Sequence, residues 1–248
     1  MEKFTVDGVV VRTSVTGEAD RILWVLTRNR GIIRAFAKGA RGTKSRLHGA
    51  TSLFAYCTFT FSEKNNVYHV NEAQVREIFF DLRKSMETLT LSQYFCEVMM
   101  KVMPENSDEE IYLRLLLNSL HFLCKGTKPE LQVKSVFEMR LACETGFMPA
   151  VIACDECGEY TGDASYYFDC ASGKLFCKAC ADKRAYPEFP LSVIEAVRHI
   201  CFSDFSRIFS FELSENGLSQ LNRLTETYIK SVFGQEFRLL DYFKDINK

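Results

Sequence analysis

Long apolar runs are missing from this 248-residue sequence, and no stretch approaches the roughly 18 uncharged residues that a membrane-spanning helix needs. The opening residues MEKFTVDGVVVR include acids and lack a small-residue cleavage site, so we expect no secretory signal. Ten cysteines would suit a disulfide scaffold only in a short secreted chain. The default expectation is an intracellular protein with reduced thiols and no membrane partner.

Recognisable catalytic motifs are also missing. The sequence has no Walker loop, no GxSxG elbow and no HExxH pair, and no acids form a recognisable paired arrangement. The four histidines are scattered rather than paired as ligands: His48, His69, His121 and His199. The sequence favours a binding module over an enzyme, and a nucleic-acid enzyme with an unfamiliar motif stays open as a third reading.

Positive charge is concentrated near the N-terminus of a chain whose formal net charge is −1. Residues 28–46, RNRGIIRAFAKGARGTKSR, hold seven Lys or Arg and no acid. Residues 1–80 hold twelve basic against seven acidic residues, while the remainder holds nineteen against 25. This asymmetry indicates a polyanionic partner for the basic part. The plain alternative is a solvated basic face.

The first 80 residues read as five short strands with little helix between them. Within YCTFTF, the side chains of Cys57, Phe59 and Phe61 fall on one face of a strand, and Glu63 to Asn66 form a plausible hairpin turn. A five-stranded OB-type β-barrel fits the count and size. An SH3-like barrel fits nearly as well on pattern alone.

After Asp81 the apolar residues repeat with the helical period of 3.6. Five such stripes span residues 91–102, 113–124, 133–141, 193–200 and 218–232. Their expected ends are Pro104, Gly126, Gly146 and Gly234, with Ser192 as one N-cap. We therefore predict an α+β multidomain fold: an OB-type barrel over residues 1–80 and an α-helical bundle over residues 81–248, with a zinc module inserted at about 150–186.

The cysteine-rich insert contains two C-x2-C pairs separated by nineteen residues, Cys154 with Cys157 and Cys177 with Cys180. Two such turns joined by a hairpin can surround Zn²⁺ tetrahedrally with four thiolates. Four thiolates would saturate the ion, so we predict one structural zinc per chain. A redox dithiol pair or two disulfides are the competing readings. Cys170, between the pairs, is a spare ligand or a packed hairpin residue.

The basic stretch has the residue types that grip phosphate. Arginine forks match phosphate oxygens, and glycines in residues 39–49 let the backbone approach a ligand. An OB barrel binds oligonucleotides across its second and third strands, where these charges fall. The candidate aromatic platforms for base stacking are Trp24, Phe36, Tyr56 and Tyr68. Five to seven phosphate contacts would give a salt slope of roughly −3.5 to −5 with little sequence specificity.

The chain resembles the RecO family, the bacterial recombination mediators and DNA-annealing proteins. The segment GVVVRTSVTGEADRILWVLTRNRGIIRAFAKGARGTKSRL is similar to the family's opening pattern, with its Gly-Glu-x-Asp turn, Thr-x-x-x-Gly and Lys-Gly-Ala-Arg run. The later ETGFMPAVIACDEC is similar to the Gly-Phe-x-Pro segment that leads into the first cysteine pair. All four zinc cysteines of the zinc-bearing members are present.

The resemblance implies a DNA-binding protein that is no enzyme and works in the cytoplasm of a bacterium at the nucleoid. It implies binding of single- and double-stranded DNA, annealing of complementary strands, and partnership with RecR, with the C-terminal tail of single-stranded DNA-binding protein (SSB) and, indirectly, with RecA. The DNA contacts it suggests are Arg12, Arg28, Arg30, Arg34, Lys38, Arg41, Lys44 and Arg46. The alternative function is a zinc-stabilised scaffold whose basic loop binds an acidic protein.

Overall fold

The computed structural model describes residues 3–103, 110–160, 164–181 and 185–246. The chain forms two compact units: residues 1–125 with 237–248, and residues 126–236. Each unit is compact by itself, although the first is built from two separate stretches of the chain. The boundary near residue 80 that the sequence suggests marks the change from strand to helix, and it stays a prediction about domain organisation.

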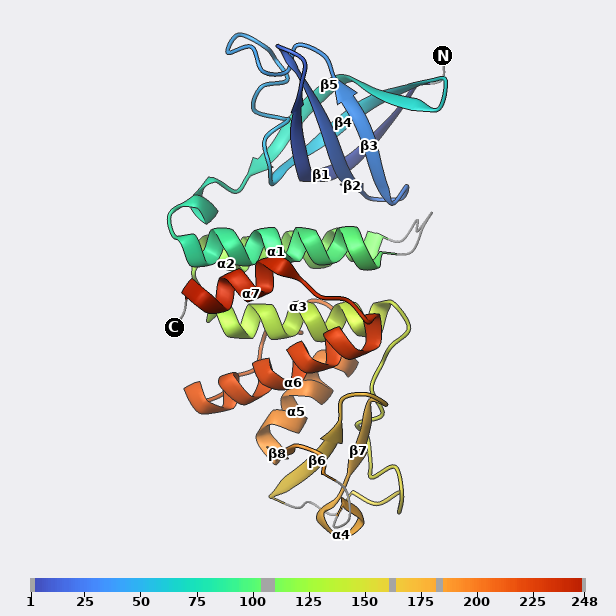
Figure 1. Ribbon diagram of the computed structural model, residues 1–248, viewed down its shortest axis with the longest axis vertical. Coiled ribbons are helices and arrows are strands. Elements are labelled where there is room, and N and C mark those ends of the chain that lie inside the picture. Colours follow the sequence, from blue (N-terminus) through green and yellow to red (C-terminus); the bar gives the residue numbers. More distant parts are fainter. Residues whose placement is uncertain (1–2, 104–109, 161–163, 182–184, 247–248) are drawn as a thin grey trace. The chain divides into compact units, whose positions relative to one another are not determined.

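The N-terminal part of the first unit is a closed five-stranded barrel in the order β1-β2-β3-β5-β4 (Figure 1). The strands are β1 (Lys3–Thr16), β2 (Asp20–Thr27), β3 (Ile32–Ala37), β4 (Ala55–Lys64) and β5 (Val67–Ile78). All neighbours pair antiparallel except β3 and β5, whose parallel pairing joins Ala35 to Tyr68 and Phe36 to His69. The parallel pair closes the barrel, and the predicted OB-type α+β fold is confirmed.

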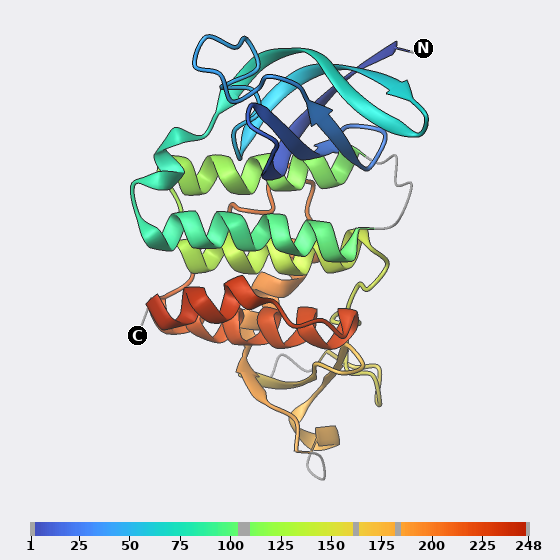
Figure 2. The ribbon, with the colours of Figure 1, turned by 45° about the horizontal axis from the view of Figure 1, so that its top comes forward.

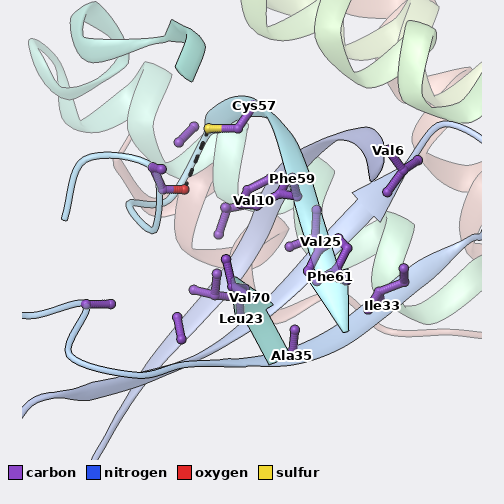
Figure 3. Packing of buried hydrophobic residues seen from close by; sticks show 14 residues of the cluster. Val6, Val10, Leu23, Val25, Ile33, Ala35, Cys57, Phe59, Phe61 and Val70 are labelled. Atoms are coloured by element: carbon purple, nitrogen blue, oxygen red, sulfur yellow. Dashed lines mark hydrogen bonds between the residues drawn. The ribbon is translucent and has the colours of Figure 1, made fainter. Parts of the chain in front are cut away.

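The barrel core follows the period of two that the strand residues show. Cys57, Phe59 and Phe61 on β4 are fully buried, and branched side chains from β1, β2 and β3 meet them (Figure 3). The Cys57 thiol donates to the Ala50 carbonyl at 3.8 Å. Burial raises the pKa of this thiol to about 12. Cys57 therefore behaves as a small apolar core residue.

The predicted hairpin turn joins β4 to β5 through Asn65 and Asn66. Both have positive φ, 52° and 60°. A two-residue turn with both residues in the left-handed region matches the twist of the flanking strands, and asparagine tolerates that region better than most residues. The hairpin therefore has a fixed tip, and Asn66 and Val67 of this tip line a pocket together with residues of β3.

The helices of the first unit are η1 (Phe80–Arg83), α1 (Met86–Val102), α2 (Glu110–Lys125) and α7 (Arg238–Ile246). Ser85 caps α1 by accepting a hydrogen bond from the Thr88 amide at 3.0 Å. Pro104, the predicted end of the first helix, lies outside the described residues. Helix α7 was not predicted, because only Leu240 and Phe243 form its buried face.

The second unit combines α3 (Glu130–Glu144), α5 (Leu191–Phe202) and α6 (Glu215–Phe233) with a small cysteine-rich module. The module contains β6 (Ser165–Asp169), β7 (Lys174–Phe176), α4 (Lys178–Ala181) and β8 (Glu188–Pro190), with the sheet order β7-β6-β8 (Figure 1). Figure 2 shows its ribbon in yellow and orange. The turn between β6 and β7 contains Gly173, whose φ is +69°. The insert is therefore a folded module, as predicted.

One predicted helix cap is wrong. Helix α5 begins at Leu191 with Pro190 as its N-cap residue, so Ser192 lies inside the first turn. The Leu191 amide donates to the Ala164 carbonyl at 2.9 Å, and β8 ends at Pro190. The strand therefore runs directly into the helix, and this tertiary contact takes the place of a side-chain cap. Gly126, Gly146 and Gly234 do follow helices with positive φ, as expected for C-terminal ends.

A charged network is buried between α3 and α6. The ammonium of Lys134 lies 2.8 Å from the Glu138 carboxylate, 2.8 Å from the Asn222 amide oxygen and 3.4 Å from Glu226. The Thr225 hydroxyl donates to Glu138 at 2.7 Å. Only 1% of the Lys134 side chain is exposed. Such a network requires all of its partners, because an unpaired buried charge is costly.

None of the helices in the described ranges combines the length and the apolar character that crossing a bilayer requires.

Candidate nucleic-acid surface and candidate metal centre

The outer face of the barrel presents an aromatic ring between two arginines. Arg12 on β1 and Arg34 on β3 both lie opposite Trp24 on β2 in the strand register. The guanidinium carbon of Arg12 lies 4.7 Å from the centre of the Trp24 ring, and that of Arg34 lies 5.5 Å from it. Both distances are within the range of a cation–π interaction. The three side chains form one row across three strands.

The row depends on a bulge in β1. Pairing with β2 shifts by one residue between Val10, opposite Val25, and Arg12, opposite Trp24. In a regular register Val11 would lie opposite Trp24 and Arg12 opposite the buried Leu23, and the Arg12 side chain would be directed into the core. The bulge therefore keeps the guanidinium on the outer face.

Arg30, in the turn between β2 and β3, continues the cationic face. Its guanidinium carbon lies 4.1 Å from the centre of the Phe4 ring. The turn is fixed by the Thr27 side chain, which accepts from the Arg30 amide at 3.1 Å and donates to the Gly31 carbonyl at 2.7 Å. Phe4 was not among the predicted residues, since only the fold brings the first strand beside this turn.

Four further cations lie on the loop after β3: Lys38, Arg41, Lys44 and Arg46, all exposed. The start of this loop is anchored, because the Gly39 amide donates to the Asp20 carboxylate at 2.7 Å and the Arg41 guanidinium donates to the Glu18 carbonyl at 2.8 Å. A carbonyl does not neutralise a guanidinium. The loop therefore presents its charge from a fixed base.

Arg28 differs from the other predicted cations. Its guanidinium forms an ion pair with Glu110 on α2 at 2.9 Å, and this partner raises the pKa of Arg28. Among the described residues, the other seven predicted cations have no carboxylate within ion-pair distance. Tyr56 lines the pocket beside the Arg28–Glu110 pair. Among these eight cations, Arg28 is thus the one that is paired with a carboxylate of the described residues.

The four cysteines predicted as ligands come together in the second unit. The sulfurs of Cys154, Cys157, Cys177 and Cys180 all lie within 4.8 Å of one another. Those of Cys157 and Cys177 are 3.9 Å apart. Tetrahedral coordination with metal–sulfur bonds of about 2.3 Å would place the sulfurs about 3.8 Å apart. The spacing therefore fits one metal ion bound by four thiolates.

Backbone contacts shape the first cysteine turn before any metal binds. The Gly158 amide donates to the Cys154 carbonyl at 2.9 Å, and Gly158 has φ +72°. Burial opposes ionisation of Cys154, but hydrogen bonds from the backbone of Cys157 and Cys177 lower its thiol pKa to about 6. A thiolate is the form that binds metal. Soft thiolate sets of this kind select zinc or iron–sulfur centres, and four protein ligands leave no open position for a substrate.

Cys170 is not part of the cluster. It is 8% exposed, and burial raises the pKa of its thiol to about 11. The packed-residue reading of Cys170 is the one that fits, and the spare-ligand reading does not.

Comparisons with known proteins agree on one family. The family model described as recombination protein O N terminal matches residues 1–79, and that described as recombination protein O C terminal matches residues 83–241. A protein named DNA repair protein RecO from Acetivibrio thermocellus is 34% identical over 248 residues, covering 100% of this chain and 99% of that protein. A protein of the same name from Caldicellulosiruptor saccharolyticus is 30% identical, covering 96% and 97%, and one from Dehalococcoides mccartyi is 29% identical, covering 99% and 96%.

Proposed function

Because the chain belongs to the RecO family, whose named members are DNA repair proteins, we propose that it acts in recombinational repair by binding single- and double-stranded DNA and annealing complementary strands. The observation that carries the proposal is the set of seven barrel cations without a carboxylate partner among the described residues, three of which stack on aromatic rings. A DNA partner would keep the protein at the nucleoid, in the cytoplasm.

Annealing needs no catalytic group. Two strands repel each other through their phosphates, and a cationic surface that neutralises both lets complementary bases sample pairing. No covalent bond is made or broken, so the protein would work as a mediator and not as an enzyme. The Arg12–Trp24–Arg34 row suits this role, because a ring stacks on any base and guanidinium groups bind phosphate.

The proposed protein partners are RecR, the SSB tail and, through them, RecA. An acidic tail with an apolar end requires an apolar groove edged by cations. A groove of about 620 Å³ in the first unit has this character, with Met100 and Leu239 among its apolar residues and Arg12, Lys101 and Arg238 among its polar ones. Glu97 also lines it, and its carboxylate is held by the Lys101 ammonium at 2.9 Å. This groove is our candidate for the tail.

For the metal we propose one zinc per chain, bound by Cys154, Cys157, Cys177 and Cys180. The four-sulfur cluster supports this proposal, and its closed ligand set suits a structural role. When bound, the ion would supply a cross-link between the two cysteine turns. The hairpin of β6 and β7 then lies beside α6, where the centres of the Phe168 and Tyr228 rings are 5.7 Å apart.

The test of the function is annealing of SSB-coated complementary oligonucleotides. Wild type should accelerate annealing, and the variant with Lys38, Arg41, Lys44 and Arg46 changed to Ala should lose most of the acceleration. Lys125→Ala, an exposed cation outside the surface, is the control and should behave as wild type. Absence of DNA binding in the wild type, together with tight binding of an acidic peptide to the N-terminal barrel, would favour the scaffold function instead.

A further inference from the structure

A pocket opens in the barrel wall where β3 and β5 part. The two strands are joined only at Ala35–Tyr68 and Phe36–His69 in the register of the described residues. Ahead of these pairs, β3 and the tip of the β4–β5 hairpin border a pocket of about 480 Å³. This volume lies within the range of pockets that hold small molecules. The opening is therefore large enough to receive a group from a ligand.

The lining of the pocket combines cations with flat and apolar side chains, and none of the described residues that form it is acidic. Arg30 and Arg34 provide the charge, Ile32 and Val67 provide apolar walls, and Phe36 and Tyr68 provide rings. Asn66, from the hairpin tip, adds an amide that can both donate and accept hydrogen bonds. A ligand with an anionic group and a flat, largely apolar group with polar edges matches this lining. A nucleotide has this composition.

The two arginines are held from outside the pocket. Arg30 stacks on Phe4 at 4.1 Å and Arg34 on Trp24 at 5.5 Å. Arg34 therefore belongs to both the Arg12–Trp24–Arg34 row and the pocket. A strand stacked on Trp24 would have a phosphate at Arg34 and its neighbouring nucleotide at the pocket.

We propose that this pocket receives one unpaired nucleobase of a DNA strand that crosses Trp24, and so makes the barrel favour single strands. The inference rests on the proposed function, since it assumes that the cationic face binds DNA. A base in a duplex is paired and stacked, and it must leave the helix before a pocket can hold it. A duplex would therefore use the arginines but not the pocket. An acidic, aromatic peptide is the competing ligand class, and the experiment includes it.

The experiment compares two strands that carry the same phosphates. One is an oligothymidylate, and the other has every base replaced by an abasic site. Wild type should bind the oligothymidylate more tightly by about five- to 150-fold for each base it stacks. Val67→Glu places a carboxylate at the mouth of the pocket, where it should exclude a base, and should lower this ratio at least fivefold. Charge repulsion acts equally on both strands, so it cancels in the ratio.

The matched control is Val75→Glu. Val75 lies on the same strand as Val67 and has a similar exposed fraction, 44% against 36%, but it does not line the pocket. It should leave the ratio at the wild-type value. Both variants replace an exposed valine, and equal melting temperatures by circular dichroism would show that both fold.

Each alternative outcome is decisive. If Val67→Glu leaves the ratio unchanged, or if Val75→Glu lowers it equally, the pocket does not hold a base, although DNA binding itself would stand. If an acidic, aromatic peptide displaces oligothymidylate from wild type but not from Val67→Glu, the pocket is a peptide site and the inference is wrong. If the wild type binds neither strand, the proposed function fails rather than the pocket alone.

Discussion

The salt dependence of DNA binding follows from the number of barrel cations that have no acidic partner. Within the part of the chain that the structure describes, seven of the eight predicted contacts have no carboxylate at ion-pair distance, and Arg28 is paired with Glu110. With about 0.7 counterions released per neutralised phosphate on a single strand, the slope of log K against log salt should be about −4.9 if all seven make contact. Affinity should then fall about 900-fold between 50 and 200 mM salt.

Two triple variants divide the surface. The first variant removes the charges that stack on rings by changing three residues to Ala: Arg12, Arg30 and Arg34. The second removes most of the charge of the loop after β3 by changing three others to Ala: Lys38, Lys44 and Arg46. Each triple leaves four contacts and should reduce the slope to about −2.8. The assay is fluorescence anisotropy of a labelled oligothymidylate over a potassium chloride series.

Glu110→Gln tests the same reasoning in the opposite direction. Removing the carboxylate frees Arg28, so the slope should steepen to about −5.6 if Arg28 then reaches a phosphate. Arg28 and Glu110 are each 54% exposed on their side chains, so the change should cost little stability. A wild-type slope flatter than −2, or a slope that neither triple variant changes, would refute the assignment of this surface to DNA.

Four further outcomes are expected. Trp24 is the only tryptophan in the chain, so its fluorescence should be quenched by bound single strands, and Trp24→Ala should cost about 1–3 kcal/mol of binding measured by anisotropy. Elemental analysis should find about one zinc per chain, and removal of the metal with a thiol-reactive mercurial and a chelator should lower the melting temperature. Gly173→Ala should destabilise the second unit by about 1–3 kcal/mol in urea unfolding, because Gly173 has φ +69° and the new Cβ would lie 2.8 Å from the Tyr228 hydroxyl. Gly126→Ala is the control and should cost less, because Gly126 has a similar φ of +63° but no atom within 4 Å of the new Cβ. Lys134→Met should cost about 3–5 kcal/mol by removing the ammonium that pairs with the buried Glu138 carboxylate, and adding Glu138→Leu should recover most of the loss.

The strand and cysteine patterns were enough to predict the barrel and the metal cluster, because both depend on short-range spacing. Alternation in YCTFTF placed Cys57, Phe59 and Phe61 inside, and two C-x2-C turns brought four sulfurs together. The arrangement of the basic residues needed the fold. The bulge at Val11 decides that Arg12 lies opposite Trp24, and nothing in the local sequence distinguishes this register from the regular one.

Pairings between distant segments were beyond sequence reasoning. Glu110 carries no local sign that it binds Arg28, and Phe4 carries none that it supports Arg30. The residue type of Ser192 predicts a cap, but the prediction is wrong because the contact of Leu191 with Ala164 decides where the helix begins. The sequence pattern does not predict helix α7, because its buried face consists of two residues, Leu240 and Phe243, and the helix packs on the distant α1.

The position of α7 also bears on how the protein is made. The amides of Arg238 and Leu239 donate to the Glu97 carboxylate at 3.3 and 3.1 Å, and the fully buried Phe237 ring contacts Tyr94 at 5.7 Å. These contacts join residues 237–239 to α1, which is synthesised before the whole second unit. During translation α7 therefore cannot pack on α1 until the whole second unit has left the ribosome. Until then the surface of α1 around Tyr94 is uncovered.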